Sequence, residues 1–202
     1  MIRAAKILTL VLLVAALLSV AFQVVVVPTA SMEGTVLVGD HLLIDRFAYG
    51  PAIPFTHLRL PRMNHVRRGD VISFHPPGHT NDVYLKRVIA VGGDRVESRD
   101  GELYVNGQRR VERYAQCAKC GRGSPEIIVP AGELYVLGDN RDHSEDSRNF
   151  GTVPERNVIG EPVIVLWSFS NPTRSWLRSQ VAVYFDHPVA HLRWHRCFQK
   201  VE

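Results

Sequence analysis

One long apolar stretch opens the chain. Residues 7–27 hold 21 residues without a charge or a proline, and Arg3 and Lys6 precede them. A helix of that length spans roughly 31 Å at about 1.5 Å per residue, which matches the hydrocarbon core of a bilayer. We therefore predict a transmembrane helix over residues 7–27, with residues 1–6 in the cytoplasm because the flanking charges are positive. A cleaved leader is the alternative, but it needs a shorter apolar region and a small-x-small cleavage site.

After residue 28 the pattern changes to short apolar runs that are separated by glycine and proline turns. Two dipeptides, Asp100-Gly101 and Asn106-Gly107, are typical of β-hairpins. Many short strands of this kind predict a mostly β domain, built of antiparallel sheets that form a partly open barrel, after the one N-terminal transmembrane helix. The segments that we expect to be strands are residues 36–38, 42–44, 71–74, 82–91, 127–129, 134–137 and 158–169.

Length and charge limit the remaining possibilities. Residues 28–202 are enough for one outer domain with its own core, and we expect a β excursion at about residues 95–133. The net charge is only +4 with both signs interspersed, so no nucleic-acid partner is expected. His75 and His79 have no evident third ligand, and we expect no metal site. Cys117 and Cys120 form a short disulfide, a redox pair or half of a zinc site, and an oxidising compartment favours the disulfide.

Ser31 lies four residues beyond the apolar stretch and is the first candidate for chemistry. A serine hydroxyl is a weak nucleophile that needs a base, and none of the nine histidines lies in a recognisable triad motif. Lys86 is the better candidate, because alternation along a strand places it on one face with Tyr84 and Val88. Burial among such neighbours lowers the pKa of a lysine and leaves it neutral. Composition alone favours a solvated lysine at a strand edge instead.

Three sequence boxes in this order resemble those of the bacterial type I signal peptidases, also called leader peptidases. They are PTASME at residues 28–33, YLKRVI at residues 84–89 and GDNRDHSEDSR at residues 138–148. The matches extend from residue 28 to about residue 162. The third box is the most specific of them, because it has eleven residues.

The resemblance implies a serine endopeptidase with a Ser-Lys dyad, in which Ser31 is the nucleophile and Lys86 the general base. Thr29 matches the residue whose hydroxyl joins the backbone N–H of Ser31 in an oxyanion hole. Ser144 matches a serine that hydrogen-bonds to the lysine and orients it. The residues that match the surrounding polar scaffold are Asp139, Arg141, Asp146, Arg148 and Arg87. We expect the acids of the third box to pair with these arginines, so that no carboxylate pairs with the lysine.

The resemblance also implies a substrate and a location. The family cleaves N-terminal signal peptides from exported preproteins after a small-x-small motif, and needs neither cofactor nor metal. The residues that match the walls of its shallow substrate pocket are Val27, Met32, Tyr84 and Leu85. The expected partners are signal peptides and the lipid bilayer, and the expected location is the bacterial cytoplasmic (inner) membrane, single-pass, with the catalytic domain on the extracytoplasmic side.

Two departures and two alternatives remain. Gly34 stands where the family usually has proline, and Gly92 stands where it often has proline. Both exchanges of proline for glycine loosen a turn. A dedicated pilin- or conjugation-type processing peptidase of the same fold is one alternative, and a catalytically dead membrane-anchored binding module is the other. The C-terminal residues 171–202, rich in Trp and Arg, are either a headgroup-level surface or an ordinary packed segment.

Overall fold

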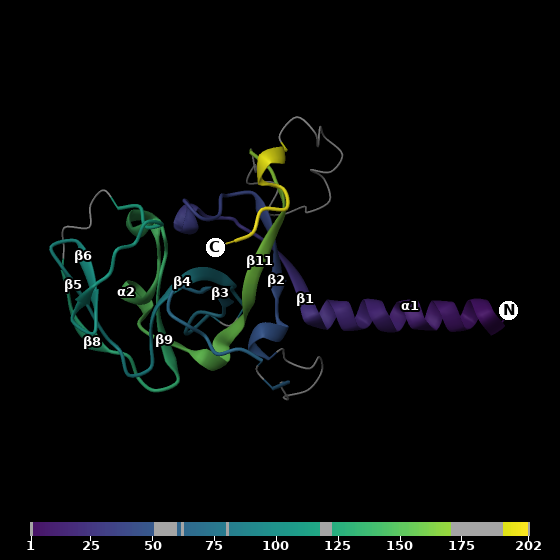
Figure 1. Ribbon diagram of the computed structural model, residues 1–202, viewed down its shortest axis with the longest axis horizontal. Helices are drawn as coiled ribbons and strands as arrows, with labels where there is room; N and C mark the ends of the chain where they lie inside the picture. The colour runs from purple at the N-terminus through teal and green to yellow at the C-terminus, as the bar shows by residue number, and fades with distance from the viewer. Residues whose placement is uncertain are drawn as a thin grey trace.

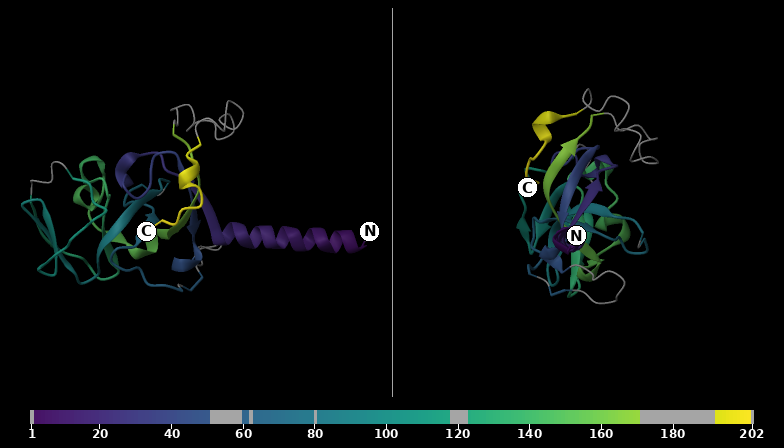
Figure 2. Two further views of the ribbon diagram at one scale, coloured as in Figure 1. Left: turned by 45° about the horizontal axis from the view of Figure 1, so that its top comes forward. Right: turned by 90° about the vertical axis from the view of Figure 1, so that its right-hand side faces the viewer.

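The computed structural model describes residues 2–50, 60–61, 63–79, 81–117, 123–170 and 192–201. An N-terminal helix, α1 (Ile2–Ala21), leads into a domain made of two β-sheets (Figure 1). The left view of Figure 2 also shows that α1 projects from one end of this domain. The prediction of a mostly β, antiparallel fold is therefore confirmed.

The predicted bounds of the helix, residues 7–27, are wrong at both ends. The helix begins at Ile2 and ends at Ala21, and the chain continues directly as strand β1 (Phe22–Val26). Consecutive valines favour a strand, and β2 (Asp40–Asp45) provides the antiparallel partner that β1 needs. The β domain therefore begins at Phe22 rather than at residue 28. Within the described residues, no helix has the length and apolarity that a membrane crossing requires.

The larger sheet has seven strands in the order β1-β2-β11-β3-β4-β9-β10, and every pairing is antiparallel. The predicted strand at residues 71–74 is confirmed as β3, and that at residues 82–91 begins two residues late as β4. Residues 36–38 form a turn instead of the predicted strand. The remaining bounds are β3 (Val71–Phe74), β4 (Tyr84–Val91), β9 (Glu133–Leu137), β10 (Val153–Pro154) and β11 (Val158–Ser168).

The smaller sheet is the predicted excursion, and it lies at the end of the domain away from α1 (Figure 1). Its strands are β5 (Arg95–Arg99), β6 (Glu102–Val105), β7 (Gln108–Arg109) and β8 (Ser124–Ile128), in the order β7-β6-β5-β8. Both predicted hairpins are confirmed. Asp100 and Asn106 have φ angles of 51° and 54°, the left-handed conformation that tight two-residue hairpins require.

Three apolar clusters hold the strands together. One packs β3, β4 and β9 around Phe74, and another joins β4 and β9 to the smaller sheet around Val96. The third includes Val27, Met32 and Val36, and lies beneath the segment that carries Ser31. The short helices are η1 (Ala30–Met32), η2 (Phe47–Tyr49), η3 (Arg141–His143), α2 (Ser147–Phe150), η4 (Glu155–Asn157) and η7 (Trp194–Arg196). Residues 51–59 and 171–191 lie outside the described residues.

Candidate active site

Ser31 lies on η1, in a loop that is closed at its base by paired backbone groups. The Val27 N–H donates to the Asp40 carbonyl (2.9 Å), and the Gly39 N–H donates to the Val27 carbonyl (2.9 Å). The third box also holds Ser31, because the Asn140 N–H donates to the Ser31 carbonyl (3.0 Å). The side chain of Ser31 is buried at the base of a cleft. Ser31 is thus held by the hydrogen bonds that close its own loop and by the backbone of the third box.

Lys86 lies on β4, and its side chain reaches Ser31 on η1. Its Nζ donates to Ser31 Oγ at 2.7 Å, and only 4% of the residue is exposed. The Tyr84 ring lies on the same side of β4, with its centroid 5.4 Å from Nζ. Burial lowers the pKa of Lys86 to about 8, although the carboxylates of Asp146, Glu145 and Asp139 act in the opposite direction. Near pH 8 a large fraction of this lysine is therefore a free base.

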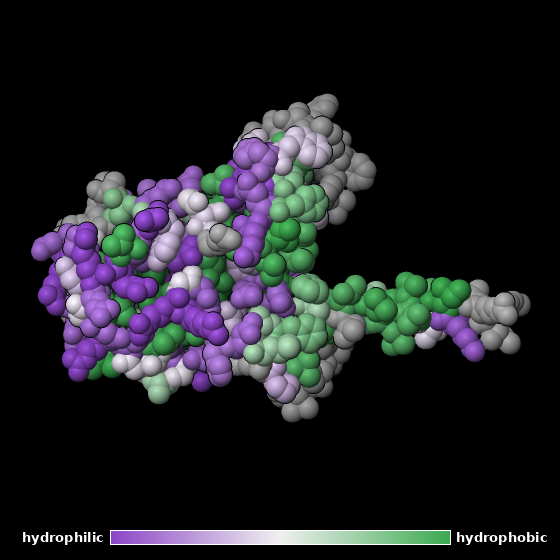
Figure 3. All heavy atoms as spheres, in the orientation of Figure 1, coloured by the Kyte–Doolittle hydropathy of each residue, from purple (hydrophilic) through white to green (hydrophobic). Residues whose placement is uncertain are grey.

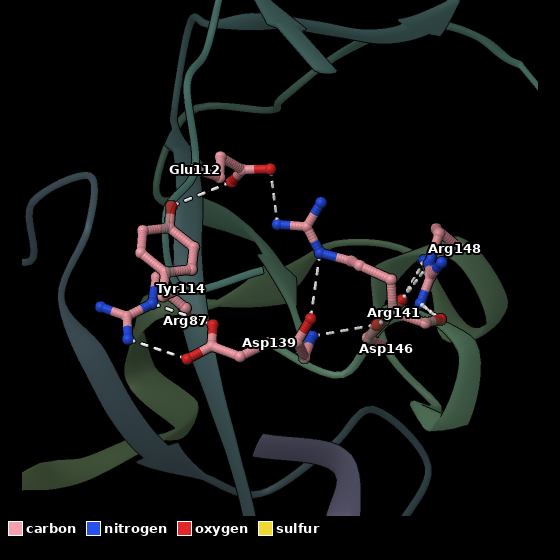
Figure 4. Close-up of polar contacts among 8 residues, drawn as sticks. Arg87, Glu112, Tyr114, Asp139, Arg141, Asp146 and Arg148 are labelled. Carbon is pink, nitrogen blue, oxygen red and sulfur yellow. Dashed lines mark hydrogen bonds and ion pairs between the residues drawn. The ribbon is translucent and has the colours of Figure 1, made fainter. Parts of the chain in front are cut away.

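The lysine lacks a close counterion. In the part of the chain that the structure describes, no carboxylate lies within ion-pair distance of Lys86 Nζ. The box acids pair elsewhere, as Figure 4 shows. Asp139 accepts two hydrogen bonds from Arg87, from Nε at 3.0 Å and from the second nitrogen at 2.8 Å. Asp146 accepts from Arg148 Nε at 2.7 Å and caps α2.

The third predicted pairing is different from expectation. Arg141 forms its ion pair with Glu112, at 2.7 Å, instead of with an acid of its own box. Glu112 also accepts from Tyr114 Oη at 2.9 Å, and the Tyr114 ring lies 4.0 Å from the Arg87 guanidinium (Figure 4). Sequence reasoning missed both residues, because they come from the excursion and belong to no motif. A charged residue that folds back over a distant box leaves no local signal.

Thr29 contacts the Ser-Lys pair through its hydroxyl, whereas Ser144 does not. Thr29 Oγ1 lies 3.3 Å from Ser31 Oγ. Ser144 makes no hydrogen bond with Lys86 in this structure, although its hydroxyl is shielded from solvent. Its side chain packs on Gly138, where an added Cβ would collide with both Ser144 and the Ser31 carbonyl. Glycine at residue 138 is therefore what allows the third box to approach the serine loop so closely.

A cleft of about 270 Å³ surrounds Ser31 and Lys86. The four side chains that we expected in the substrate pocket all line it, namely Val27, Met32, Tyr84 and Leu85. Two residues of the third box also line it without having been predicted. They are His143 and Glu145, and Glu145 accepts a hydrogen bond from Tyr84 Oη at 3.3 Å. The cleft is apolar along its walls, with these polar groups added by the third box.

Among the described residues, no group of three or more His, Cys, Asp or Glu side chains is placed so that it could hold a metal ion. Cys117 is disulfide-bonded and Cys197 is free. Cys120, which we expected as the partner of Cys117, lies outside the described residues.

Comparison with known proteins decides the family. The sequence model of the signal peptidase family (signal peptidase, peptidase S26) matches residues 1–167. The chain belongs to this family. The resemblance that the three boxes indicated is therefore confirmed, and residues 168–202 lie beyond the matched region.

Several relatives of this family are known by name. Signal peptidase I of Pseudomonas aeruginosa is 30% identical over 187 residues, covering 74% of this chain and 66% of the relative. Signal peptidase I of Leptolyngbya laminosa is 36% identical over 148 residues, covering 70% and 66%. Signal peptidase IB of Staphylococcus aureus is 31% identical, covering 69% and 75%. The match with the first two relatives thus spans 66% of their length.

One solved structure is also similar in sequence. It is a signal peptidase I from Enterococcus faecalis, 32% identical, with a TM-score of 0.42, and the match covers 48% of this chain and 97% of that one.

Proposed function

We propose that this protein is a membrane-bound serine endopeptidase that cleaves N-terminal signal peptides from exported preproteins. The observation that supports this most strongly is the contact of 2.7 Å between Lys86 Nζ and Ser31 Oγ in an apolar cleft. Burial without a close carboxylate favours the neutral amine, and only a neutral amine accepts a proton. The membership in the signal peptidase family supports the same activity.

The first chemical step is acylation of Ser31. Lys86 takes the proton of the Ser31 hydroxyl while Oγ forms a bond to the scissile carbonyl carbon. The carbonyl π bond breaks, and its electron pair becomes the oxyanion. The Ser31 N–H and the Thr29 hydroxyl are proposed to donate hydrogen bonds to that oxygen. Thr29 supports this assignment because its Oγ1 lies 3.3 Å from the attacking atom.

The second half of the reaction returns the lysine to its starting state. The Lys86 ammonium gives its proton to the leaving amine as the peptide C–N bond breaks. The neutral Lys86 amine then removes a proton from water, whose oxygen attacks the acyl carbon on Ser31. As the ester bond between that carbon and Ser31 Oγ breaks, Lys86 gives the proton to Oγ, and the product with its new carboxyl group is released. Arg87, Asp139, Arg141, Asp146, Arg148 and Ser144 are proposed as the scaffold that keeps the lysine free of a negative neighbour.

The substrate is proposed to bind as an extended peptide beside β4. In the described part of the chain, β9 pairs with β4 only from Arg87 onward, so residues 84–86 have a backbone edge toward the cleft. An added strand can use such an edge for main-chain hydrogen bonds. The apolar side chains of Val27, Met32 and Leu85 line the cleft and suit small side chains of the peptide, such as the alanines of a small-x-small motif.

The membrane attachment is a further part of the proposal. The apolar side chains of α1 are largely uncovered, with Leu8, Leu10 and Leu13 between 60% and 63% exposed (Figure 3). Lipid contact would cover these exposed apolar side chains on the projecting helix. The proposed orientation puts the catalytic domain on the extracytoplasmic side, because Arg3 and Lys6 precede the apolar stretch.

The test is direct cleavage of a preprotein. The detergent-solubilised protein is incubated with a preprotein that carries a small-x-small site, and the new N-terminus is mapped by mass spectrometry. A single cut after that site supports the proposal, and Ser31→Ala should abolish it while the domain stays folded. An intact preprotein with the wild-type protein, or cutting that persists in Ser31→Ala, would contradict it.

A further inference from the structure

The C-terminal segment, residues 192–201, packs along β11 beyond the region that the family sequence model matches. The Phe198 N–H donates to the Val165 carbonyl (2.6 Å), and the Val165 N–H donates to the Gln199 carbonyl (2.8 Å). Figure 1 shows the segment in yellow beside the end of β11 and close to the loop that follows η1. The family assignment therefore says nothing about what this segment does.

Two arginines of this segment converge on one buried carboxylate, that of Asp40. Arg196 Nε and its terminal nitrogen donate to the two carboxylate oxygens at 3.2 and 2.6 Å, and a terminal nitrogen of Arg193 lies 3.5 Å away. Arg193 Nε also donates to Ser168 Oγ (2.7 Å), whose hydroxyl donates to Asp40. Asp40 itself is 0% exposed. Two cations on one fully buried carboxylate make this contact specific and rigid.

Asp40 is also the residue that closes the base of the Ser31 loop. Its carbonyl accepts from the Val27 N–H (2.9 Å), and its carboxylate accepts from the Leu37 N–H (2.8 Å). The twelve residues between Val27 and Asp40 contain Ser31 and Thr29. A shift of Asp40 therefore changes the hydrogen bonds that close the serine loop.

The loop turns at a glycine on the side that follows Ser31. Gly34 adopts a φ of 111° and is exposed, a conformation that only glycine reaches easily. The next residue is held from outside, because a terminal nitrogen of Arg196 donates to the Thr35 carbonyl (3.2 Å). Arg196 thus contacts the loop at its base, through Asp40, and again just beyond Gly34.

We propose that Arg193 and Arg196 are positioning residues for the serine loop, and that the C-terminal segment acts through Asp40 and Thr35 to keep Ser31 Oγ in reach of Lys86. The proposal rests on the proposed function, since it assigns a role in the same cleavage reaction. It predicts that the segment contributes to kcat although none of its described residues lines the cleft.

The test uses the full-length protein with Arg196→Gln, Arg193→Gln and the conservative variant Arg196→Lys. Arg110→Gln is the matched control, because Arg110 is an exposed arginine after β7 of the other sheet. Peptide cleavage gives kcat and KM, and hydrogen exchange follows the amides of Leu37 and Gly39. We expect Arg196→Gln to lower kcat about 10- to 100-fold with KM little changed, because small misplacements of reacting atoms have effects of that size.

The exchange measurement separates positioning from general stability. We expect faster exchange at Leu37 and Gly39 in Arg196→Gln, unchanged exchange at Val88 of β4, and partial recovery of kcat in Arg196→Lys. A kcat equal to that of Arg110→Gln would overturn the proposal, and so would faster exchange at Val88 as well as in the loop. If the wild-type protein cleaves no peptide, the proposed function fails. The exchange at Leu37 and Gly39 then still decides whether the segment holds the loop.

Discussion

The two faces of β4 bury adjacent cations in opposite surroundings. Lys86 faces the apolar cleft with Ser31 Oγ at 2.7 Å, and no described carboxylate pairs with it. Arg87 faces the other way and is held by both oxygens of Asp139, by the Gly69 carbonyl and by the Tyr114 ring. Both residues are 4% exposed. The two residues are equally buried, but Arg87 has a carboxylate partner and Lys86 has none among the described residues.

That difference separates chemistry from support. Burial without a counterion lowers the pKa of Lys86 to about 8, which prepares a base. Burial with a counterion fixes Arg87 and Asp139 as a rigid support, where loss of either partner leaves a buried charge unpaired. The acidic box can thus lie beside the lysine because its charges are already paired on the other side. The variants below test this division, from the largest expected effect to the smallest.

Lys86→Arg should be nearly inactive. Arginine keeps the charge and much of the length, but it does not deprotonate in proteins, so it offers no base. We expect kcat to fall by about 10²–10⁴-fold, the range of a lost general base, and Lys86→Ala to be similarly inactive. The measurement is peptide cleavage at pH 8 with both variants checked for folding. A substantial fraction of wild-type kcat in Lys86→Arg would exclude Lys86 as the base.

Asp139→Asn should weaken the fold rather than the base. It leaves the Arg87 guanidinium buried without its carboxylate, and we expect the free energy of unfolding to fall by about 3–5 kcal/mol in urea titrations.

Lys86→Met is the matched control for Asp139→Asn, because it removes the buried cation on the other face of β4. The folded protein binds the Lys86 proton less readily than the unfolded chain, so wild-type stability rises as the pH increases from 8 toward 10.5. At pH 7 the methionine variant should be at least as stable as the wild type. Equal losses in Asp139→Asn and Lys86→Met would contradict the comparison of the two faces.

Thr29→Val tests the oxyanion donor on the cleft face. Valine keeps the branched shape but removes the hydroxyl, and we expect kcat to fall by about 10²–10³-fold with little change in KM. Thr35→Val is the companion variant on the paired face, where the hydroxyl donates to Asp139 at 2.5 Å. Its main effect should be on stability, about 1 kcal/mol. A normal kcat in Thr29→Val would remove Thr29 from the site.

Glu112→Gln should have a smaller effect on stability than Asp139→Asn. It weakens the ion pair with Arg141, in which both side chains are less than 10% exposed, but it keeps a hydrogen-bonding group there. We expect a loss of about 1–3 kcal/mol in unfolding free energy. The control is Glu102→Gln, whose ion pair with Arg109 is exposed and should contribute about 0–1 kcal/mol. Equal losses in the two variants would show that Glu112 gives the box no special support.

The sequence predicted the division between the faces of β4 but not the partners. Alternation along a strand correctly placed Lys86 and Arg87 on opposite sides, because the side-chain period of a strand is two. The helix bounds were wrong because an unbroken apolar run reads alike as a membrane helix and as a buried strand. Val27, at the end of this apolar run, is therefore part of the core of the β domain and not of the helix. Local patterns could not distinguish the two.

Long-range contacts were the other gap. Glu112 reaches Arg141 from the segment that follows β7, and Arg196 reaches Asp40 across 156 residues, so neither pairing has a signature in local spacing. The box motif identified Asp139 and Asp146 as scaffold candidates, and the structure pairs them with Arg87 and Arg148. The expected hydrogen bond between Ser144 and Lys86 is not formed in this structure, and the Ser144 side chain packs on Gly138.

The pH dependence of kcat/KM tests the central claim most directly, because it reports the pKa of the essential base in the free enzyme. If Lys86 is that base, kcat/KM rises with pH, reaches half its maximum near pH 8 and is lost as Lys86 gains a proton below it. A midpoint near pH 6.5 would contradict the account and indicate that a histidine is the base. A midpoint above about pH 10 would mean that the lysine is solvated, as in free lysine, and not prepared by burial.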